Sequence, residues 1–231
     1  MYCYETHLHT YPVSACAKAS VRENLVHYKA LGYAGVFITN HFLDGNINID
    51  RNLPYEQRLD FYFSDYEEAK IIGTEIGLAV FDGVELSFWG TDFLVYGLHK
   101  DWFLAHPEIE TMDKTQELQL MMDSGALVIQ AHPYREANYI NHIRLFPRNV
   151  QGVEVYNAGR TDFENAMASH YADSYGLLRF HGTDNHRAGK QVLYGGMASD
   201  TPITDEQDFV RRVLAGQMHP FTRTVKLEEL P

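Results

Sequence analysis

Two pairs of potential metal ligands stand near the two ends of the chain. The stretch ETHLHT contains His7 and His9, and the stretch HGTDNH contains Asp184 and His186. Side chains alternate between the two faces of a β-strand, so residues two apart point the same way. Imidazole and carboxylate groups directed to one side are ligands that zinc, iron and manganese accept. The first chemistry to consider is therefore metal binding.

Four further candidates lie between these pairs, and each closes a different β-rich run at its carboxyl end. They are His41 in FITNHF, Glu85 in GVELSF, His99 in LVYGLH and His132 in IQAHPY. A lone histidine is more often a hydrogen-bonded surface or core residue than a ligand. That interpretation does not explain six histidines and two carboxylates at strand ends. We therefore expect the eight residues to form one cluster.

Eight ligands exceed what one tetrahedral ion needs. Two or three ions that share a bridging carboxylate use them more economically, and such clusters generate hydroxide and clamp a displacement at phosphorus. The two cysteines, Cys3 and Cys16, form neither a disulfide framework nor a CxxC pair. We predict a site for two to three divalent metal ions, which could be zinc, iron or manganese.

Short β-rich runs alternate with helical patterns, which predicts an α/β fold with a largely parallel sheet. The expected strands lie within residues 2–9, 33–40, 78–88, 92–99, 126–133, 150–157 and 177–184. The expected helices cover residues 20–31, 64–76, 112–124, 162–175 and 205–215. About seven strands in 231 residues suit a compact, incomplete β/α (TIM-like) barrel, whose active site occupies the carboxyl ends of the strands.

Capping patterns mark the ends of these helices. Four expected capping boxes are formed by Ser20 with Glu23, Ser64 with Glu67, Thr161 with Glu164 and Thr204 with Gln207. The glycines expected to end helices are Gly32, Gly77, Gly125, Gly176 and Gly216. Residues 42–63 follow a strand end without a helical period, so we predict a mobile loop that covers the active site or is anchored to the barrel by its aromatic residues.

The composition fits one globular domain that spans residues 1–231. Apolar residues make up 45% of the chain, but no run approaches the length of a membrane span, and the amino terminus lacks signal-peptide features. We therefore expect a cytoplasmic protein with no membrane partner. The net charge of -12 argues against nucleic acid as a partner, because that binding needs a basic stripe. The sequence leaves the oligomeric state open.

The order of these motifs resembles the PHP (polymerase and histidinol phosphatase) superfamily across nearly the whole chain. The matching elements are HLH, a histidine after the second strand, a mid-chain glutamate, GLH, AHP and the terminal DNH. The resemblance implies a distorted seven-stranded β/α barrel that hydrolyses phosphoesters. It also implies three metal positions: one held by His7, His9, Glu85 and Asp184, a second bridged by Glu85 and held by His99 and His132, and a third served by His41 and His186.

The chain departs from this family in its first motif. The family usually supplies an aspartate or histidine about five residues after the second histidine, where this chain has Ser14. A hydroxyl is a poor ligand, and Cys16 could replace it only if the loop bends suitably. We therefore expect the third metal position to be the weakest.

Two arginines lie just beyond expected strand ends, after the stretches AHPY and YNAG. Arg135 and Arg160 could hold phosphate oxygens through paired N–H donors, or could be ordinary surface cations. Glu154 could hydrogen-bond a ligand histidine, or could be a solvated or capping carboxylate. The residues expected to carry the catalysis are Glu85, Asp184, His186, Arg135 and Arg160.

The leading hypothesis is a metal-dependent phosphoesterase that acts on a small phosphorylated substrate, such as histidinol phosphate, a nucleotide or another metabolite, through a metal-activated hydroxide. An amidohydrolase-type hydrolase also begins with HxH, but His186 and His99 favour the phosphoesterase. A non-catalytic metal-binding or regulatory protein is the other alternative, and Ser14 is its best support. A nuclease or proofreading module fits the acidic composition poorly.

Overall fold

A computed structural model describes residues 1–226, and the carboxyl end of the expected domain, residues 227–231, lies outside the described residues. The strands in the described part are β1 (Tyr2–Glu5), β2 (Gly35–Ile38), β3 (Ala79–Phe88), β4 (Thr91–Tyr96), β5 (Leu127–Ala131), β6 (Gly152–Asn157), β7 (Leu178–Gly182), β8 (Leu193–Ser199) and β9 (His219–Thr224). The helices are α1 (Val21–Ala30), α2 (Tyr55–Ile76), α3 (Lys100–Ala105), the 3-10 helix η1 (Pro107–Thr111), α4 (Lys114–Asp123), α5 (Asp162–Tyr175) and α6 (Glu206–Leu214).

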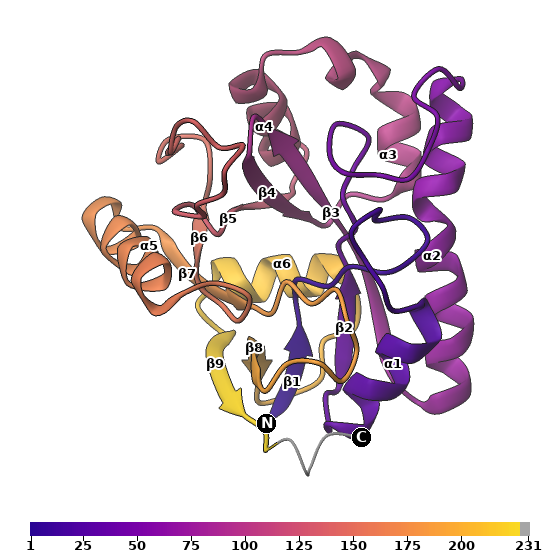
Figure 1. The fold of residues 1–231 in the computed structure, drawn as a ribbon, viewed down its shortest axis with the longest axis vertical. Helices are drawn as coiled ribbons and strands as arrows, with labels where there is room; N and C mark the ends of the chain where they lie inside the picture. The colour runs from indigo at the N-terminus through magenta and orange to yellow at the C-terminus, as the bar shows by residue number, and fades with distance from the viewer. Residues whose placement is uncertain (227–231) are drawn as a thin grey trace.

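The strands form one sheet that curves into a nearly closed barrel (Figure 1). Strands β1 to β7 follow one another in space, and β8 and β9 continue the sheet beyond β1. The pairs among β1, β2 and β3 are parallel, as are those among β5, β6 and β7, whereas β4 and β8 run against their neighbours. A bridge between Leu8 and Asn185 joins the segments that follow β1 and β7, which draws the two sides of the barrel together.

The expected strand count is wrong, because the described residues form nine strands in a mixed sheet rather than seven in a largely parallel one. The seven expected strands correspond to β1 to β7. The sequences of the two missed strands, LYGGMAS and HPFTRT, carry paired glycines and a proline, which weaken the β signal. Strand β8 pairs with β1 on one side and with β9 on the other.

Local patterns set both ends of several helices. Two expected capping boxes are confirmed at the starts of α1 and α5, formed by Ser20 with Glu23 and by Thr161 with Glu164. The backbone has a positive φ just after five helices, a conformation that glycine adopts without steric penalty. These positions are the expected ones: Gly32, Gly77, Gly125, Gly176 and Gly216.

The other two expected capping boxes are wrong. Helix α2 begins directly after Pro54, so Ser64 lies inside the helix and its hydroxyl donates to the carbonyl oxygen of Phe61. Helix α6 is capped by Asp205 rather than by Thr204. In both cases another residue with the right backbone geometry, a proline or an aspartate, starts the helix at a different position.

The expected loop over residues 42–63 is a loop only as far as residue 54. The buried side chains of the helical part are Leu59, Tyr62 and Phe63. The hydroxyl of Tyr62 donates to backbone carbonyl oxygens of Asn40 and Gly83, which fixes α2 to the barrel. The aromatic residues of this stretch therefore anchor it to the core instead of covering a site.

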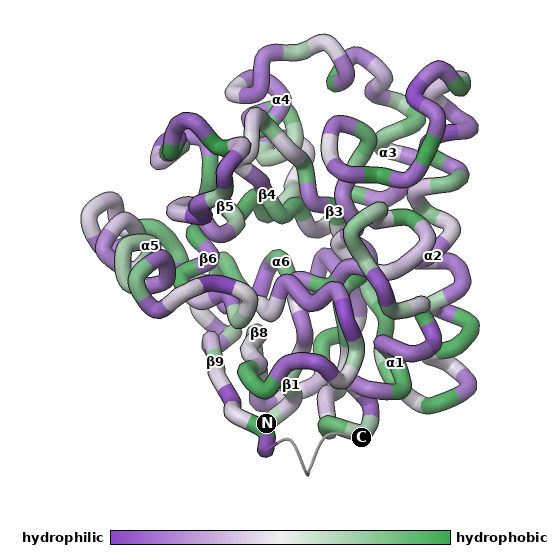
Figure 2. The backbone as a smooth tube through the Cα atoms, viewed as in Figure 1, coloured by the Kyte–Doolittle hydropathy of each residue, from purple (hydrophilic) through white to green (hydrophobic). Residues whose placement is uncertain are grey.

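Apolar and aromatic side chains fill one end of the barrel, where α6 lies across the interior (Figure 1). The ring of Phe209 on α6 packs against Phe37, Tyr96 and Phe180, with ring centroids 4.4, 5.4 and 6.1 Å apart. Figure 2 shows hydrophobic segments around β4 in the middle of the barrel and hydrophilic loops at the rim. Within the described residues, no helix combines the length and the apolar character that crossing a membrane requires.

Candidate metal centre

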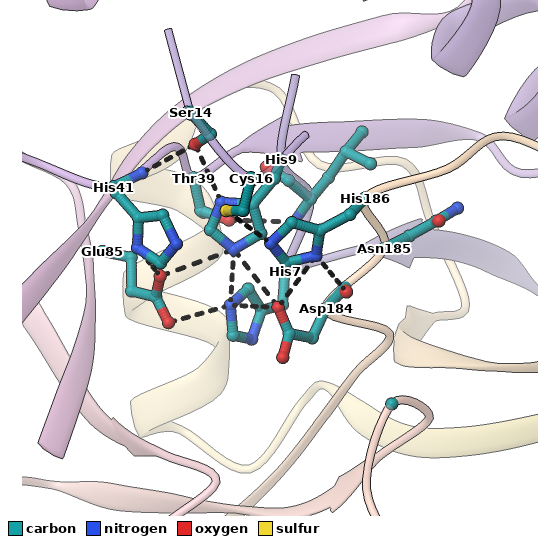
Figure 3. A network of polar contacts seen from close by, with 12 residues as sticks. His7, His9, Ser14, Cys16, Thr39, His41, Glu85, Asp184, Asn185 and His186 are labelled. Atoms are coloured by element: carbon teal, nitrogen blue, oxygen red, sulfur yellow. Dashed lines mark hydrogen bonds and ion pairs between the residues drawn. The ribbon is translucent and has the colours of Figure 1, made fainter. Parts of the chain in front are cut away.

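Imidazole and carboxylate side chains converge in one cluster (Figure 3). Each residue stands in or just after the carboxyl end of a strand: His7 and His9 after β1, His41 after β2, Glu85 in β3, His132 after β5, and Asp184 and His186 after β7. Seven of the eight expected ligands are therefore brought together. The location matches the end of β/α barrels that carries active sites.

Glu85 lies at the centre of this cluster and is fully buried. Its Oε1 lies 3.1 Å from Nε2 of His7 and 3.3 Å from Nε2 of His132. Its Oε2 lies 2.6 Å from Nδ1 of His41 and 3.4 Å from Nε2 of His9. One carboxylate thus faces four imidazoles, which is the arrangement of a ligand that bridges two ions.

Asp184 faces the same histidines from the other side. Its Oδ1 lies 3.3 Å from Nε2 of His9 and 3.6 Å from Nε2 of His7. Three groups of possible ligand atoms each lie within 4.8 Å of one another: His7, Glu85 and His132; His7, His9 and Asp184; and His9, His41 and His186. The geometry therefore offers three neighbouring positions for ions, and His7 and His9 each belong to two of them.

Several buried atoms of the cluster have no hydrogen-bond partner among residues 1–226. They are both carboxylate oxygens of Glu85, Nδ1 of His41, Nε2 of His132 and Oδ2 of Asp92. An unpartnered buried polar atom is unfavourable by a few kcal/mol. Divalent cations would satisfy these atoms together, so the residues present fit a metal centre.

The charges in the cluster keep its two central carboxylates in the ionised form that binds metal ions, whereas a bound ion would have to displace the proton that they favour on His7. Burial alone would raise the pKa of Glu85 and Asp184, but the imidazoles around them hold both well below their usual values. Burial lowers the pKa of His7, but the surrounding carboxylates outweigh it and raise it well above its usual value. Burial and two neighbouring imidazoles lower the pKa of His9. Both carboxylates are therefore ionised, as metal ligands must be.

Glu154, in β6, accepts hydrogen bonds from two of the clustered histidines on the side that faces away from Glu85. Its Oε1 accepts a hydrogen bond from Nδ1 of His7 at 2.9 Å, which turns Nε2 of that ring toward Glu85. Its Oε2 accepts from the backbone N–H of His132 at 3.0 Å and from the side chain of Asn157 at 2.9 Å. Of the two roles considered for Glu154, the structure places it against a candidate ligand histidine rather than in solvent or at a helix cap.

Two residues of the cluster have a backbone conformation that L-amino acids rarely adopt. His132 has a φ of 23° and Asp184 a φ of 53°, and both follow the end of a strand. Such conformations persist where the surrounding structure imposes them, which happens most often at functional sites. The unusual backbone conformations of His132 and Asp184 therefore occur in the same cluster as the buried atoms without hydrogen-bond partners.

His99 does not join the cluster, so this expectation is wrong. Strand β4 is antiparallel to both of its neighbours, and its carboxyl end therefore points toward the opposite end of the barrel. The side chain of His99 is 51% exposed, with Nδ1 at 3.7 Å from Oδ2 of Asp82. It also stands at the start of α3.

The same reversal brings Asp92, which sequence reasoning missed, to the site. Its buried Oδ2 lies 3.9 Å from Nε2 of His132 and 3.3 Å from Nη1 of Arg135. The turn before β4 contains Trp89 and Gly90, with φ of 53° and 84°. Only two residues separate β3 from β4, which suffices for a hairpin but not for a parallel crossover, so the short spacing was a signal that could have predicted the reversal.

A cavity of about 540 Å³ opens beside the cluster. Arg135 and Arg160 line it with His41, Asp184 and His186. The guanidinium group of Arg160 lies 3.8 Å from Oδ2 of Asp184. A larger cavity, about 670 Å³, lies between α1 and residues 187–190, and no candidate ligand lines it. The smaller cavity is therefore the one that fits the chemistry.

No family model matches the chain, and no curated protein matches it in sequence. Solved structures do match. A two-domain protein of Bacteroides vulgatus that contains a predicted PHP-like metal-dependent phosphoesterase is 12% identical, with a TM-score of 0.69 over 95% of this chain and 64% of that one. The chain thus spans less than two thirds of that protein's length.

Three further structures match over nearly the whole length of both chains. A candidate metal-dependent phosphoesterase of Bifidobacterium adolescentis is 16% identical, with a TM-score of 0.53 over 93% of this chain and 96% of that one. PsfC of Pseudomonas syringae is 13% identical, with a TM-score of 0.58 over 99% and 94%. An amidohydrolase of Chromobacterium violaceum, solved with bound sulfate and no metal, is 16% identical, with a TM-score of 0.52 over 97% and 99%. At these identities the likeness establishes the fold alone, and two of the neighbours that share it are named as metal-dependent phosphoesterases.

Proposed function

We propose that the chain is a metal-dependent phosphoesterase that hydrolyses a small phosphomonoester at a site for two to three divalent ions. The observation that carries this proposal is the convergence of seven imidazole and carboxylate side chains, among which Glu85, His41 and His132 have buried atoms without a hydrogen-bond partner among the described residues. Fold neighbours named as metal-dependent phosphoesterases support the same class of reaction.

The proposed ligand sets draw on the three groups of close atoms and on the contact of Asp92 with His132. The first ion is assigned to His7, His9, Glu85 and Asp184, the second to Glu85, His132 and Asp92, and the third to His41 and His186. Asp92 takes the place that was expected for His99. Bound divalent ions would activate water and polarise the phosphoryl oxygens.

The protein's own groups would hold and orient the substrate. Arg135 and Arg160 stand on the cavity wall next to carboxylates of the cluster, so a phosphate that pairs with them lies against the proposed ligands. Guanidinium groups bind phosphate oxygens in pairs and stabilise the negative charge that grows in the transition state. Asp184 lies between Arg160 and His9 and thereby links the phosphate-binding side of the cavity to the ligands.

The size of the cavity favours a small substrate, because pockets for small molecules typically measure about 300–1,000 Å³. Residues 44–46 of the loop before α2 line its mouth, and we assign to them the limit on substrate size. The N46W variant should raise the KM of larger phosphoesters more than that of smaller ones, at unchanged metal content. An unchanged ranking of substrates would contradict this role.

The direct test is a phosphatase assay with p-nitrophenyl phosphate and a panel of metabolite phosphoesters, with metal analysis of the same sample. We expect hydrolysis that depends on added Mn²⁺ or Zn²⁺, disappears with a chelator and returns when metal is restored. Protein that retains its metal but hydrolyses no phosphoester would contradict the proposal and favour the non-catalytic alternative.

The amidohydrolase among the fold neighbours favours a second candidate, hydrolysis of an amide-type bond at the same metal centre. Amide substrates tested under the same conditions separate the two activities. We expect phosphoester turnover without amide turnover, because two arginines line the cavity and suit a dianionic group.

A further inference from the structure

The hydroxyl of Ser14 cannot serve as the ligand that the first motif lacks. It receives a hydrogen bond from the backbone N–H of His41 at 3.0 Å and donates to Oδ1 of Asn40 at 2.8 Å. It also lies 3.0 Å from Nδ1 of His9, the ring nitrogen that faces away from the cluster. One donor and two acceptor sites are thereby all used. Ser14 orients His9 from behind, and the third ion position needs another ligand.

The chain turns after Ser14, where the N–H of Ala17 donates to the carbonyl oxygen of Ser14, and Cys16 lies next to His186 (Figure 3). The Sγ atom of Cys16 lies 3.0 Å from Nε2 of His186, and the thiol also interacts with His41. Backbone hydrogen bonds fix the bend: Ala15 N–H donates to Asn46, and Lys18 N–H donates to the carbonyl oxygen of His186. Cys16 is thus held against the two histidines by the chain on both sides of it.

The histidine side chains near this thiol give separate evidence for a cation site. The atoms of His9, His41 and His186 lie within 4.8 Å of one another. His41 is only 8% exposed, and its Nδ1 has no hydrogen-bond partner among the described residues. The rings of His41 and His186 centre 4.4 and 4.2 Å from that of His9. Three imidazoles therefore gather beside the cavity that Cys16 also lines, and the sulfur approaches them on the His186 side.

We propose that the Cys16 thiolate is a ligand of the third metal ion, together with His41 and His186. This inference rests on the metal centre of the proposed function and adds a ligand that the sequence pattern does not supply. Metal–sulfur and metal–nitrogen bonds of roughly 2.3 and 2.0 Å in a tetrahedral site separate the two donor atoms by roughly 3.5 Å. The observed 3.0 Å between Sγ and Nε2 of His186 needs only a small adjustment.

A thiolate changes which metal this position prefers. Carboxylate and imidazole ligands accept manganese, whereas a soft sulfur ligand favours zinc. The third position should therefore select Zn²⁺, while the two positions that contain Glu85, Asp184 and Asp92 tolerate Mn²⁺. The C16D variant should retain an ion there but shift its preference toward Mn²⁺.

Cobalt substitution tests the proposal without reference to activity. Protein stripped of metal is titrated with Co²⁺, and the near-ultraviolet absorption that reports a sulfur-to-cobalt bond is measured together with bound cobalt. The wild type should show this band. The C16S variant should lose both the band and one of the bound cobalt ions, whereas the C3S variant should keep the band. Cys3 is the other cysteine of the chain and lies on β1, so it serves as the matched control.

Alkylation of the unaltered protein gives a second readout that does not depend on a variant's folding. Bound Zn²⁺ should protect Cys16 from a thiol-alkylating reagent, as mapped by mass spectrometry, and leave the reactivity of Cys3 unchanged. Wild-type protein that binds cobalt without the sulfur band, a C16S protein that keeps it, or Cys16 that is alkylated equally with and without zinc would overturn the proposal. Failure of the wild type to bind any cobalt would instead contradict the whole metal centre. This outcome distinguishes a failure of the proposed function from a failure of the Cys16 proposal.

Discussion

Strand β3 carries two buried carboxylates, Glu85 and Asp82, whose surroundings shift their pKa values in opposite directions. Glu85 faces four imidazoles at the open end of the barrel, and its pKa is held well below its usual value although burial opposes this. Asp82 lies three residues earlier, beside Glu206 of α6. Burial raises the pKa of Asp82 to about 7, and Glu206 raises it further, while the half-exposed His99 and the backbone N–H of Gly83 lower it too little to compensate.

The difference shows that a buried carboxylate near a histidine is not by itself a metal site. The Asp82 carboxyl group is surrounded by too little positive charge to stay ionised, so it retains a proton near neutral pH. The Glu85 carboxylate stays ionised and leaves both oxygens without hydrogen-bond partners among the described residues, whereas only Oδ2 of Asp82 lacks one. What separates the two places is the number of imidazoles that face the oxygen atoms.

The largest expected effect comes from exchanging the two carboxylates for amides. E85Q should lower metal affinity and kcat/KM by at least about 100-fold, since it removes the proposed bridging ligand itself. D82N, on the same strand, should change both by less than a few-fold. Metal analysis and phosphatase assays on the two variants, with circular dichroism to show that both fold, measure the contrast. Equal losses in the two variants would remove the distinction between the two regions.

The arginines of the cavity should affect turnover but not metal content. R135A should lower kcat/KM by about 100-fold, the range seen when one donor to a developing negative charge is removed. R135K should recover part of this loss, because it keeps the charge but not the paired donors. R22A alters an exposed arginine that pairs with Glu75 and serves as the control. A loss of bound metal in R135A would show that Arg135 acts through Asp92 instead.

Glu154 should act on the ions through the histidines it holds. E154Q should weaken metal binding about 10- to 100-fold, as the loss of a carboxylate partner of a ligating histidine generally does. The effect follows from the hydrogen bonds of Glu154 to His7 and to the backbone of His132. Metal titration of E154Q tests it, and an affinity equal to that of the wild type would make Glu154 a packing residue only.

The effect expected to leave metal binding and turnover least changed concerns pH and the Asp82 region. The pKa of Asp82 rises from 3.8 to about 7 on folding, so between these values the folded state holds a proton that the unfolded state has lost. The contribution of Asp82 to stability therefore becomes less favourable as pH rises through this window, by an amount on the order of a few kcal/mol. D82N should gain stability relative to the wild type between pH 4 and 7, as measured by urea unfolding. A constant difference over that range would contradict the raised pKa.

The period-two spacing of His7 and His9, and the positions of His41, His132 and Asp184 at strand ends, were sufficient to predict which residues meet. These rules work because parallel strands deliver their carboxyl ends to one edge of a sheet. His99 was misplaced because the same rule was applied to β4, an antiparallel strand. The direction of a strand depends on its turn, and the WG hairpin turn fixed it here.

Other features depend on the path of a loop, which residue spacing does not specify. The bend at residues 14–18 that brings Cys16 to His186 relies on backbone hydrogen bonds to segments far along the chain. The early start of α2 relies on the packing of Tyr62 on the barrel, which overrides the weak helical pattern before Ser64. The pair β8 and β9 has a weak β pattern and gains its place by pairing along the edge of β1.

The metal centre itself is tested most directly by anomalous diffraction from crystals grown with Mn²⁺ and Zn²⁺, collected on both sides of each absorption edge. The account predicts two or three peaks within bonding distance of Glu85 and the five clustered histidines, with none beside Asp82 and His99. The peak next to His41 and His186 should be zinc. Fully loaded crystals with no peak at Glu85, or with a peak at Asp82 instead, would contradict it.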